Sequence, residues 1–360
     1  MSRKAEHMDL ALHAEVERIS GPGWDELDLV HEALPELDVA EVDLSVDLFG
    51  RRLRAPLVIA AMTGGHAGAV EVNATLARAA ERHGLAMGVG SQRAALADPS
   101  LVDSYAIVRE CAPTAPVIGN IGAAQLIGQG EAPALSIDDL RRAVDMVGAD
   151  ALAIHLNFLE ESVQPEGDAH TKGCAEAIGA VASALEVPIV VKETGAGMSR
   201  RTAERLRDLG VAALDVGGAG GTSFAIVERL RARQQGDHAS YALGMALGEW
   251  GIPTAATVAA TAPVGLPVIA TGGVRGGLDA AKAIALGATA AGVARPLLAA
   301  AVEGEQQLDT WIEEFTAELR TVMLLTGSGT TTALQHQPLV AHGRLRDWLG
   351  MWPSTARASL

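Results

Sequence analysis

Eight short apolar segments recur along the chain between residues 55 and 293, and most of them end in a polar or glycine-rich turn. Stretches with helical periodicity, such as residues 71–83 and 137–147, separate them. This alternation is typical of a parallel sheet covered by helices. Eight strands suffice to close an α/β fold of the (β/α)8 TIM barrel type, which we predict, with an open doubly wound sheet as the alternative. The predicted strands begin near Ala55, Leu85, Pro116, Ala151, Pro188, Ala212, Leu266 and Thr289.

Three of the predicted helices end in the same way before a buried strand. Gly148, Gly210 and Gly287 each follow the last apolar residue of a helix. Glycine is common at this position because it adopts a left-handed backbone conformation without steric cost. Hydrophobic residues make up 49% of the chain and aromatic residues only 3%, so small aliphatic side chains must fill the interior. Both observations favour successive βα units.

The remaining segments are assigned to the same unit, so we predict one domain over residues 1–360. Residues 1–55 form an N-terminal extension without strong periodicity. A long amphipathic helix is predicted from residue 303 to residue 325, and residues 303–360 are expected to form a C-terminal helical cap.

Charge and cysteine content exclude several classes of protein. The net charge of -16 argues against a broad surface for nucleic acid or for an anionic membrane. Cys111 and Cys174 are isolated, so neither a zinc site nor a disulfide framework is indicated. The N-terminus lacks the apolar core of a signal peptide, which predicts a cytoplasmic protein. Three prolines interrupt the uncharged run 251–274, which we interpret as a short helix and a buried strand.

The loop after the fourth predicted strand is crowded with groups that can do chemistry. Residues 155–168 contain one imidazole, two amides and four carboxylates. Side chains at the carboxyl ends of barrel strands face the active site, whatever reaction the barrel catalyses. The four carboxylates cannot all be buried and ionised without a cation, so several point to solvent or a Mg²⁺ ion joins them. His155 is a base, a cofactor contact or an interior histidine with satisfied hydrogen bonds.

Glycine-rich turns follow the last two predicted strands. Gly272 and Gly273 follow the seventh strand, and Gly292 lies in the eighth. Backbone N–H groups of such loops bind phosphate at this position in many barrels. Lys192, at the end of the fifth strand, is a Schiff-base nucleophile, a cation beside a ring cofactor, or a lysine paired with Glu193. These residues alone indicate a phosphate-binding barrel enzyme, with a flavin as the favoured cofactor.

A set of motifs spread over nearly the whole chain resembles one family, the type 2, FMN-dependent isopentenyl diphosphate isomerases. Single pieces of this set recur in other FMN barrels, but the combination is specific. The motifs are Arg3-Lys4-Ala-Glu6-His7, Met62-Thr-Gly-Gly65, Gly90-Ser-Gln-Arg93, His155-Leu-Asn157, Gln164-Pro-Glu-Gly-Asp168, Val191-Lys-Glu193, Asp215-Val-Gly-Gly-Ala-Gly-Gly-Thr222, Trp250-Gly-Ile-Pro-Thr254 and Thr271-Gly-Gly-Val-Arg275.

The resemblance implies a barrel that binds FMN, Mg²⁺ and a prenyl diphosphate, with NADPH as a reductant of the flavin and a homotetramer or homo-octamer as the assembly. It implies Glu161 as the metal ligand. The implied FMN contacts are Ala61, Met62, Thr63, Ser91, Asn120, Lys192, Thr222, Gly272, Gly273, Ala291 and Gly292. The implied substrate contacts are Arg3, Lys4, His7, Ser91, Gln92, Arg93, His155, Asn157 and Glu160. Arg3, Lys4 and His7 could alternatively belong to a solvated terminus.

One residue differs from the family pattern at a position that, by the resemblance, lies near the reacting carbons of the substrate. The family has Gln-Glu after His-Leu-Asn, whereas this chain has Glu160 followed by Glu161. A carboxyl can hold or donate a proton where an amide cannot. We expect a retained isomerase with Glu160 and His155 as the catalytic residues. A weakened isomerase, a changed prenyl diphosphate substrate, a net flavin oxidoreductase and a non-catalytic binding protein are the alternatives.

Overall fold

The computed structural model describes residues 3–130, 132–164, 166–167 and 170–352, with the side chains from residue 6 onward. Its centre is a closed barrel of eight strands in the order β10-β11-β4-β5-β6-β7-β8-β9, and all neighbouring pairs are parallel. Each strand begins within two residues of its predicted start, which confirms the barrel. The strands are β4 (Leu57–Ile59), β5 (Ala86–Gly88), β6 (Val117–Gly122), β7 (Ala151–Leu156), β8 (Ile189–Glu193), β9 (Ala213–Asp215), β10 (Val268–Thr271) and β11 (Ala290–Val293).

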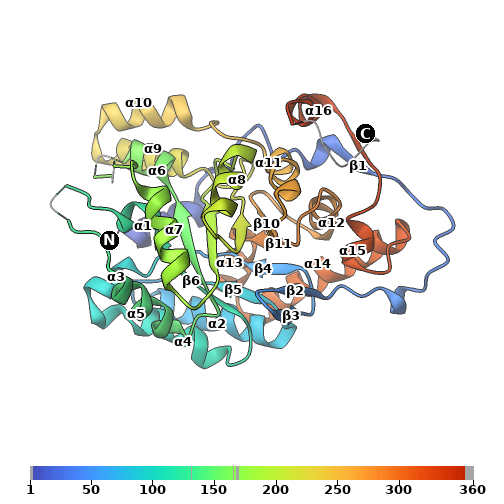
Figure 1. Cartoon of the computed structure of the whole chain (residues 1–360), viewed down its shortest axis with the longest axis horizontal. Coiled ribbons are helices and arrows are strands. Elements are labelled where there is room, and N and C mark those ends of the chain that lie inside the picture. The colour runs from blue at the N-terminus through green and yellow to red at the C-terminus, as the bar shows by residue number, and fades with distance from the viewer. Residues whose placement is uncertain (1–2, 131, 165, 168–169, 353–360) are drawn as a thin grey trace.

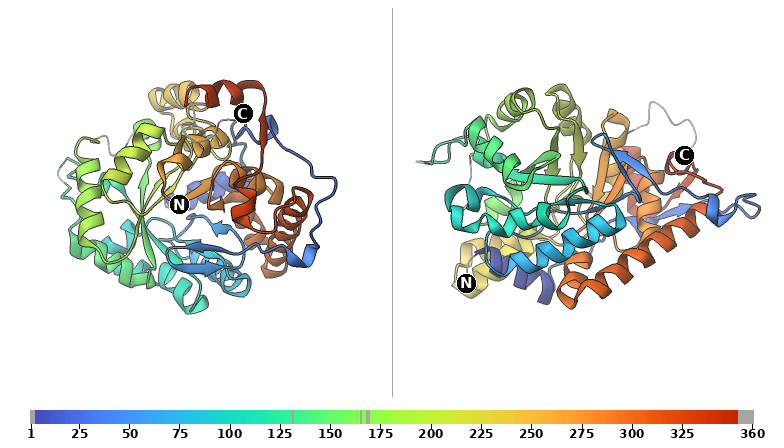
Figure 2. Two further views of the ribbon diagram at one scale, coloured as in Figure 1. Left: turned by 45° about the vertical axis from the view of Figure 1, so that its right-hand side comes forward. Right: turned by 90° about the horizontal axis from the view of Figure 1, so that it is seen from below.

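The helices surround the strands and separate them from solvent (Figures 1 and 2). Helices α2 (Ala69–His83), α5 (Ile137–Val147), α11 (Thr254–Thr261) and α14 (Glu305–Leu325) match the helices predicted above. Helices α4 (Asp103–Cys111), α7 (Cys174–Ala184), α8 (Arg200–Asp208) and α12 (Gly277–Ala285) lie between successive barrel strands. Further helices are α1 (Arg3–His13), α3 (Arg93–Ala97), α6 (Phe158–Val163), α9 (Phe224–Gln235), α10 (His238–Leu247), α13 (Arg295–Glu303), α15 (Thr331–Leu334) and α16 (Gly343–Gly350).

The predicted glycine helix ends are present. Gly148, Gly210 and Gly287 have φ angles of 50°, 84° and 109°, a region that side chains other than glycine rarely adopt. Each glycine turns the chain from a covering helix into the next strand, β7, β9 or β11. A glycine with a positive φ angle therefore ends the helix in each of these three βα units, as the sequence predicts.

A short hairpin closes one end of the barrel. It consists of β2 (Val46–Leu48) and β3 (Arg51–Leu53). Leu48 and Leu53 are buried and pack in one cluster with residues at or near the amino ends of the barrel strands, among them Val58 and Ala86. A functional cavity must therefore open at the other end, where the strands have their carboxyl ends.

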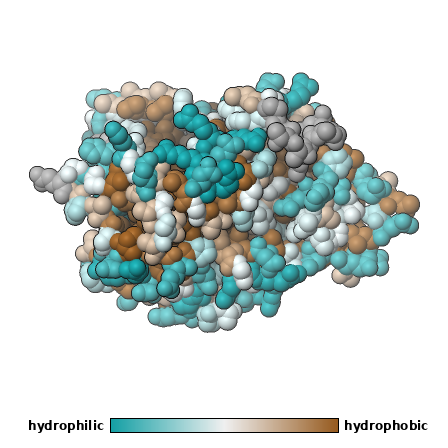
Figure 3. Space-filling model, in the orientation of Figure 1, coloured by the Kyte–Doolittle hydropathy of each residue, from teal (hydrophilic) through white to brown (hydrophobic). Residues whose placement is uncertain are grey.

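The two ends of the chain pack against the barrel at different places. Helix α1 lies beside α9 and α13, whereas α14 runs along α2 and α12 (Figure 2). Strand β12 (Leu339–Ala341) pairs antiparallel with β1 (Leu27–Leu29), so the expected helical cap contains a strand as well. Apolar side chains gather over the left-hand part of the face shown in Figure 3, which includes α10. In the described part of the chain, every helix is too short or too polar to cross a membrane.

Candidate active site

One cavity of about 470 Å³ lies at the carboxyl ends of the barrel strands, and helix α1 forms part of its wall through His7, Met8 and Ala11. Almost every candidate site residue whose side chain is described lines this cavity. The lining residues that were predicted to bind FMN are Ala61, Met62, Thr63, Ser91, Asn120, Lys192, Thr222, Gly272, Gly273 and Gly292. Those predicted to bind substrate or metal are His7, Ser91, Arg93, His155, Asn157, Glu160 and Glu161.

The structure does not bring every candidate to the cavity wall. Gln92, which was expected to contact the substrate, is fully buried and is not among the residues that line the cavity. Its amide nitrogen donates to the Ala143 carbonyl at 2.7 Å, and its amide oxygen accepts from the Asn120 N–H at 2.9 Å. Ala291 is also fully buried, in β11. Arg3 and Lys4 begin helix α1, but their side chains lie outside the described part of the structure, as does Asp168.

A chain of hydrogen bonds runs from the core to the cavity through Gln92, Asn120 and His155. Asn120 donates its side-chain N–H to the Val89 carbonyl at 3.0 Å. The Asn120 amide oxygen lies 2.9 Å from Nδ1 of His155. An amide oxygen only accepts, so this contact places the proton of the imidazole on Nδ1 and turns Nε2 away from Asn120.

The glycine-rich turns form a cradle for an anionic group. A Cβ at Gly272 would lie 2.3 Å from the Gly218 carbonyl oxygen, and both Gly272 and Gly273 have positive φ angles. Arg275 and Arg295 line the same part of the cavity and form ion pairs with Glu17 at 2.8 and 3.2 Å. Backbone N–H groups together with guanidinium groups suit the oxygens of a phosphate.

The end of β8 supplies a cation with two buried carboxyls nearby. Lys192 lines the cavity, and its Nζ lies 3.5 Å from the backbone oxygen of Glu193. Burial raises the pKa of Glu193 to about 7, although its carboxylate accepts N–H groups of residues 195–197. Burial also raises the pKa of Asp215, against the nearby charge of Lys192. The charge of Lys192 therefore acts on both carboxyls.

The segment predicted as a loop after β7 begins instead with helix α6, which carries both adjacent glutamates. Asn157 precedes the helix and donates its side-chain N–H to Glu161 at 2.8 Å and to Glu160 at 3.2 Å. Glu161 is only 7% exposed. Both carboxyl groups lie at the cavity, because Glu160 and Glu161 occupy the first turn of α6 and both accept hydrogen bonds from Asn157.

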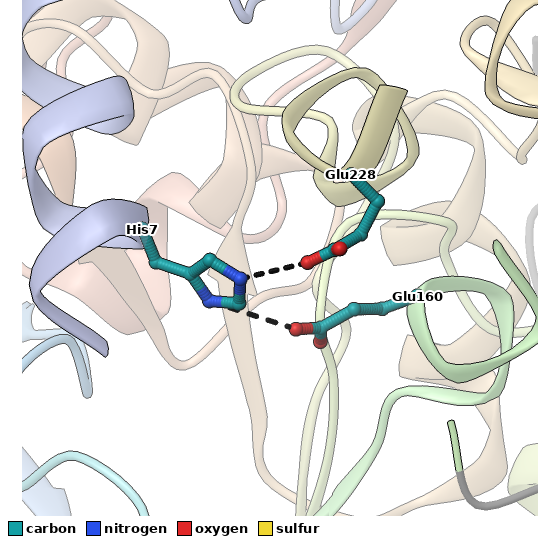
Figure 4. A group of neighbouring side chains, drawn as sticks. All are labelled: His7, Glu160 and Glu228. Carbon is teal, nitrogen blue, oxygen red and sulfur yellow. Dashed lines mark ion pairs between the residues drawn. The ribbon is translucent and has the colours of Figure 1, made fainter. Parts of the chain in front are cut away.

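Glu160 also belongs to a cluster with His7 and Glu228, which come from α1 and α9 (Figure 4). Nε2 of His7 lies 2.7 Å from Glu228, and Nδ1 lies 3.9 Å from Glu160. The amide of Gln164 donates to both carboxylates, at 3.1 and 3.0 Å. Because the imidazole faces the two carboxylates with different nitrogens, the arrangement suits a bridging histidine better than convergent metal ligands.

The two carboxyls of this cluster differ in their pKa values. Burial raises the pKa of Glu160, and the nearby charge of His7 only partly opposes it. Burial would also raise the pKa of Glu228, but the hydrogen bond and charge of His7 together with Arg231 hold it below its ordinary value. A proton in the cluster is therefore held more readily on Glu160 than on Glu228.

Several residues of the site were not predicted. Arg275 and Arg295 follow the glycine-rich turns closely along the chain. A cationic residue next to a predicted phosphate-binding turn is a sequence feature by which they could have been predicted. Glu228 and Arg231 are buried charges on one face of α9, three residues apart, and the sequence carries no comparable signal for them.

The chain matches the family model described as FMN-dependent dehydrogenase over residues 18–98 and 136–341. It is 47% identical to the isopentenyl-diphosphate delta-isomerase of Methanosarcina barkeri, over 97% of this chain and 94% of that one. The enzyme of the same name from Halobacterium salinarum is also 47% identical, over 96% and 95% of the two chains.

Among solved structures, a mandelate oxidase mutant with a monooxide FMN adduct has a TM-score of 0.62 and 21% identity, covering 94% of this chain and 93% of that one. A structure titled as a putative lactate oxidase of Pediococcus acidilactici has a TM-score of 0.64 and 17% identity, covering 92% and 87%. These two structures support the barrel fold. The near-complete match to the curated relatives goes further, and on it the chain belongs to the isopentenyl-diphosphate delta-isomerases that share the FMN-dependent dehydrogenase barrel.

Proposed function

We propose that this protein interconverts isopentenyl diphosphate and dimethylallyl diphosphate by adding a proton at one carbon and removing one from another, without net oxidation. The observation that carries the proposal is that one cavity brings together glycine-rich turns, a half-buried lysine, and a group of histidine, amide and carboxyl side chains. The match to isomerases over nearly the whole chain supports the same substrate.

FMN fits the cavity. The glycine turns pack closely at the cavity wall, because a Cβ at Gly272 or Gly273 would clash with the carbonyl oxygen of Gly218 or Gly220. Arg275 and Arg295 add positive charge there, and Lys192 is the cation for the isoalloxazine ring. When bound in its reduced form, FMN supplies an acid and base beside the substrate. We propose NADPH as the reductant that brings FMN to this state.

Mg²⁺ fits the donor set around Glu161. This ion takes oxygen ligands, and commonly binds one or two carboxylates together with waters and substrate phosphates. Asn157 holds Glu161 by a hydrogen bond of 2.8 Å, which fixes the carboxylate at the cavity wall. We propose that Glu161 would hold the Mg²⁺ ion, which would offset negative charge on a bound diphosphate.

The diphosphate itself is proposed to lie against the polar wall opposite the glycine cradle. Arg93, His155 and Asn157 line this wall, and His7 approaches it from α1. Ser91, Arg3 and Lys4 complete the proposed set. Met8, Met62 and Leu298 give the cavity apolar walls, which suit a prenyl chain and exclude water. Exclusion of water matters because protonation of an alkene creates a species with carbocation character that water would trap.

Glu160 and His155 are the proposed catalytic side chains. Glu160 lines the cavity, faces His7 and accepts a hydrogen bond from Gln164, so its carboxyl is fixed in place. His155 lines the cavity and is oriented by the hydrogen bond between its Nδ1 and the amide oxygen of Asn120. We propose that Glu160 keeps the isomerase activity in the position where the family has glutamine; a changed prenyl diphosphate is the alternative.

The assembly and location are also proposals. Helix α10 and the turn after it expose Leu243, Met245 and Trp250 at 44%, 54% and 64%. Exposed apolar side chains of this kind favour association of subunits, and we propose a cytoplasmic homotetramer or homo-octamer. Light scattering of the purified protein would give a mass four or eight times the 37.1 kDa of the chain.

A net flavin oxidoreductase is the second candidate, because the family model and the oxidase structures share the barrel. The two activities differ in stoichiometry. An anaerobic assay with FMN, Mg²⁺, NADPH and isopentenyl diphosphate tests the proposal: an isomerase forms dimethylallyl diphosphate in excess of the NADPH consumed. Consumption of one NADPH for each molecule of a reduced product, with no dimethylallyl diphosphate formed, would support the oxidoreductase instead.

A further inference from the structure

Arg231 on helix α9 is a buried cation that joins three separate segments. It is only 5% exposed. Its Nε donates to Glu6 of α1 at 3.1 Å, one Nη donates to Glu228 of α9 at 2.6 Å, and the other donates to Glu166 at 3.2 Å. Glu166 follows α6, the helix that carries Glu160 and Glu161.

Arg231 is not among the residues that line the cavity. Two of its partners, Glu6 and Glu228, are linked to His7, which does line the cavity. Glu6 is the neighbour of His7 on α1. Glu228 forms the ion pair of 2.7 Å with His7. Through these contacts the guanidinium fixes the edge of α1 that faces the cavity.

We propose that Arg231 is a positioning residue that holds α1 against the site, so that His7, Met8 and Ala11 complete the wall of the substrate pocket. This inference deepens the proposed function and rests on it for the identity of the substrate. Arg231 acts through α1 and Glu228 and touches no reacting atom.

The guanidinium group is the feature that makes this role specific. It presents its N–H donors in a rigid plane, and here it uses three nitrogens toward three carboxylates. A lysine ammonium is a compact charge and cannot reach all three partners at once. Replacing Arg231 by lysine therefore keeps a cation near Glu228 but loosens α1.

The consequence is an effect on binding. If α1 is docked for only a fraction of the time, the apparent affinity for substrate falls by that fraction. We expect Arg231→Lys to raise KM for isopentenyl diphosphate by about tenfold or more while kcat stays within about threefold. Glu6→Gln, which removes only the α1 side of the clamp, should change KM in the same direction and by less.

Hydrogen exchange measured on the FMN-loaded protein provides a readout that does not depend on turnover. Amides of residues 6–13 should exchange faster in Arg231→Lys and in Glu6→Gln than in the native protein, and the strands should not. Arg233→Lys is the matched control, because Arg233 lies two residues away on the same helix and is exposed. It should leave both exchange and KM unchanged.

Two results would overturn the proposal. Unchanged exchange and KM in Arg231→Lys would show that α1 is held without this residue. Loss of FMN and faster exchange throughout the barrel would show a general structural role. Absence of isomerase activity in the native protein would instead contradict the proposed function, while hydrogen exchange would still decide whether Arg231 holds α1.

Discussion

At the scale of single residues, the chemistry of this site depends on where buried charges are placed and what opposes them. Glu160 and Glu228 lie near the same histidine, but of these two carboxyls it is Glu228 that also pairs with Arg231. The two carboxyls therefore have pKa values that shift in opposite directions. Such a separation is common where one carboxyl serves as an acid and its neighbour as a fixed charge.

Glu160→Gln tests the proposed role of the unusual carboxyl. The amide keeps the shape and some hydrogen bonds but cannot donate a proton as an acid, so we expect kcat to fall by at least about tenfold. Steady-state kinetics with reduced FMN measures this effect. Glu176→Gln, at an exposed glutamate of α7, is the control. Full activity in Glu160→Gln would mean that the carboxyl does no acid–base work.

Glu193 gives a prediction on stability and pH. Its pKa rises from 4.5 to about 7 on folding, so the folded protein binds the proton more tightly than the unfolded chain does. The associated stabilisation is full below the unfolded pKa and is lost as the pH rises through the folded value. The free energy of unfolding should therefore fall between pH 5 and pH 8, by up to about 3 kcal/mol.

Glu193→Gln should reduce this pH dependence, because an amide oxygen still accepts the N–H groups of residues 195–197 but does not titrate. Urea unfolding at the two pH values measures the difference. An equal pH dependence in the native protein and the variant would contradict the assignment to Glu193.

At the scale of elements, α2 and α14 are joined by a cluster of ion pairs that lies away from the cavity. Arg82 binds Asp309 through both carboxylate oxygens at 2.9 Å, and His83 lies 2.9 Å from the same group. Arg78 and Arg82 also contact Glu305. These partners hold the pKa of Asp309 below its ordinary value, against the effect of burial.

Asp309→Asn should lower the free energy of unfolding by about 1 kcal/mol at low salt, since these groups are partly exposed and screened by water. The loss should shrink at about 1 M salt, where exposed charges no longer interact over this range. Denaturant unfolding at the two salt concentrations measures it. A larger loss at high salt would contradict an ionic origin. Activity should not change, because α14 lies outside the cavity wall.

The strands could be predicted from the sequence and some of the helices could not. Each barrel strand is an apolar run bounded by glycine, proline or polar residues, so its place along the chain follows from burial on both faces. Helix α9 has no clear apolar stripe, because Glu228 and Arg231 are buried within it. Helix α6 is a short turn of helix in a polar stretch, and local periodicity does not reveal it.

At the scale of the whole molecule, the barrel explains why most candidate residues meet. Residues at the carboxyl ends of eight parallel strands must gather at one end, so Met62, Asn120, His155, Lys192 and Gly272 could be placed together from the sequence. Pairings between distant segments could not. Nothing local indicates that His7 in α1 lies beside Glu228 in α9, or that Gln92 turns into the core.

The elements at the two ends of the barrel also explain how the site is closed. A hairpin and apolar residues fill the amino end of the barrel, and α1 covers part of the other end. A small prenyl substrate enclosed in this way meets apolar walls and one polar patch rather than solvent. This arrangement suits a proton shift on an alkene, which requires a dry and well-placed acid.

An isomerisation in this cavity leaves the oxidation state of the substrate unchanged. The most direct test is an anaerobic incubation of the FMN-loaded protein with Mg²⁺, isopentenyl diphosphate and a limiting amount of NADPH. We predict that dimethylallyl diphosphate accumulates far beyond the NADPH supplied. Product that stops at the amount of NADPH, or no product while both ligands bind, would contradict the account.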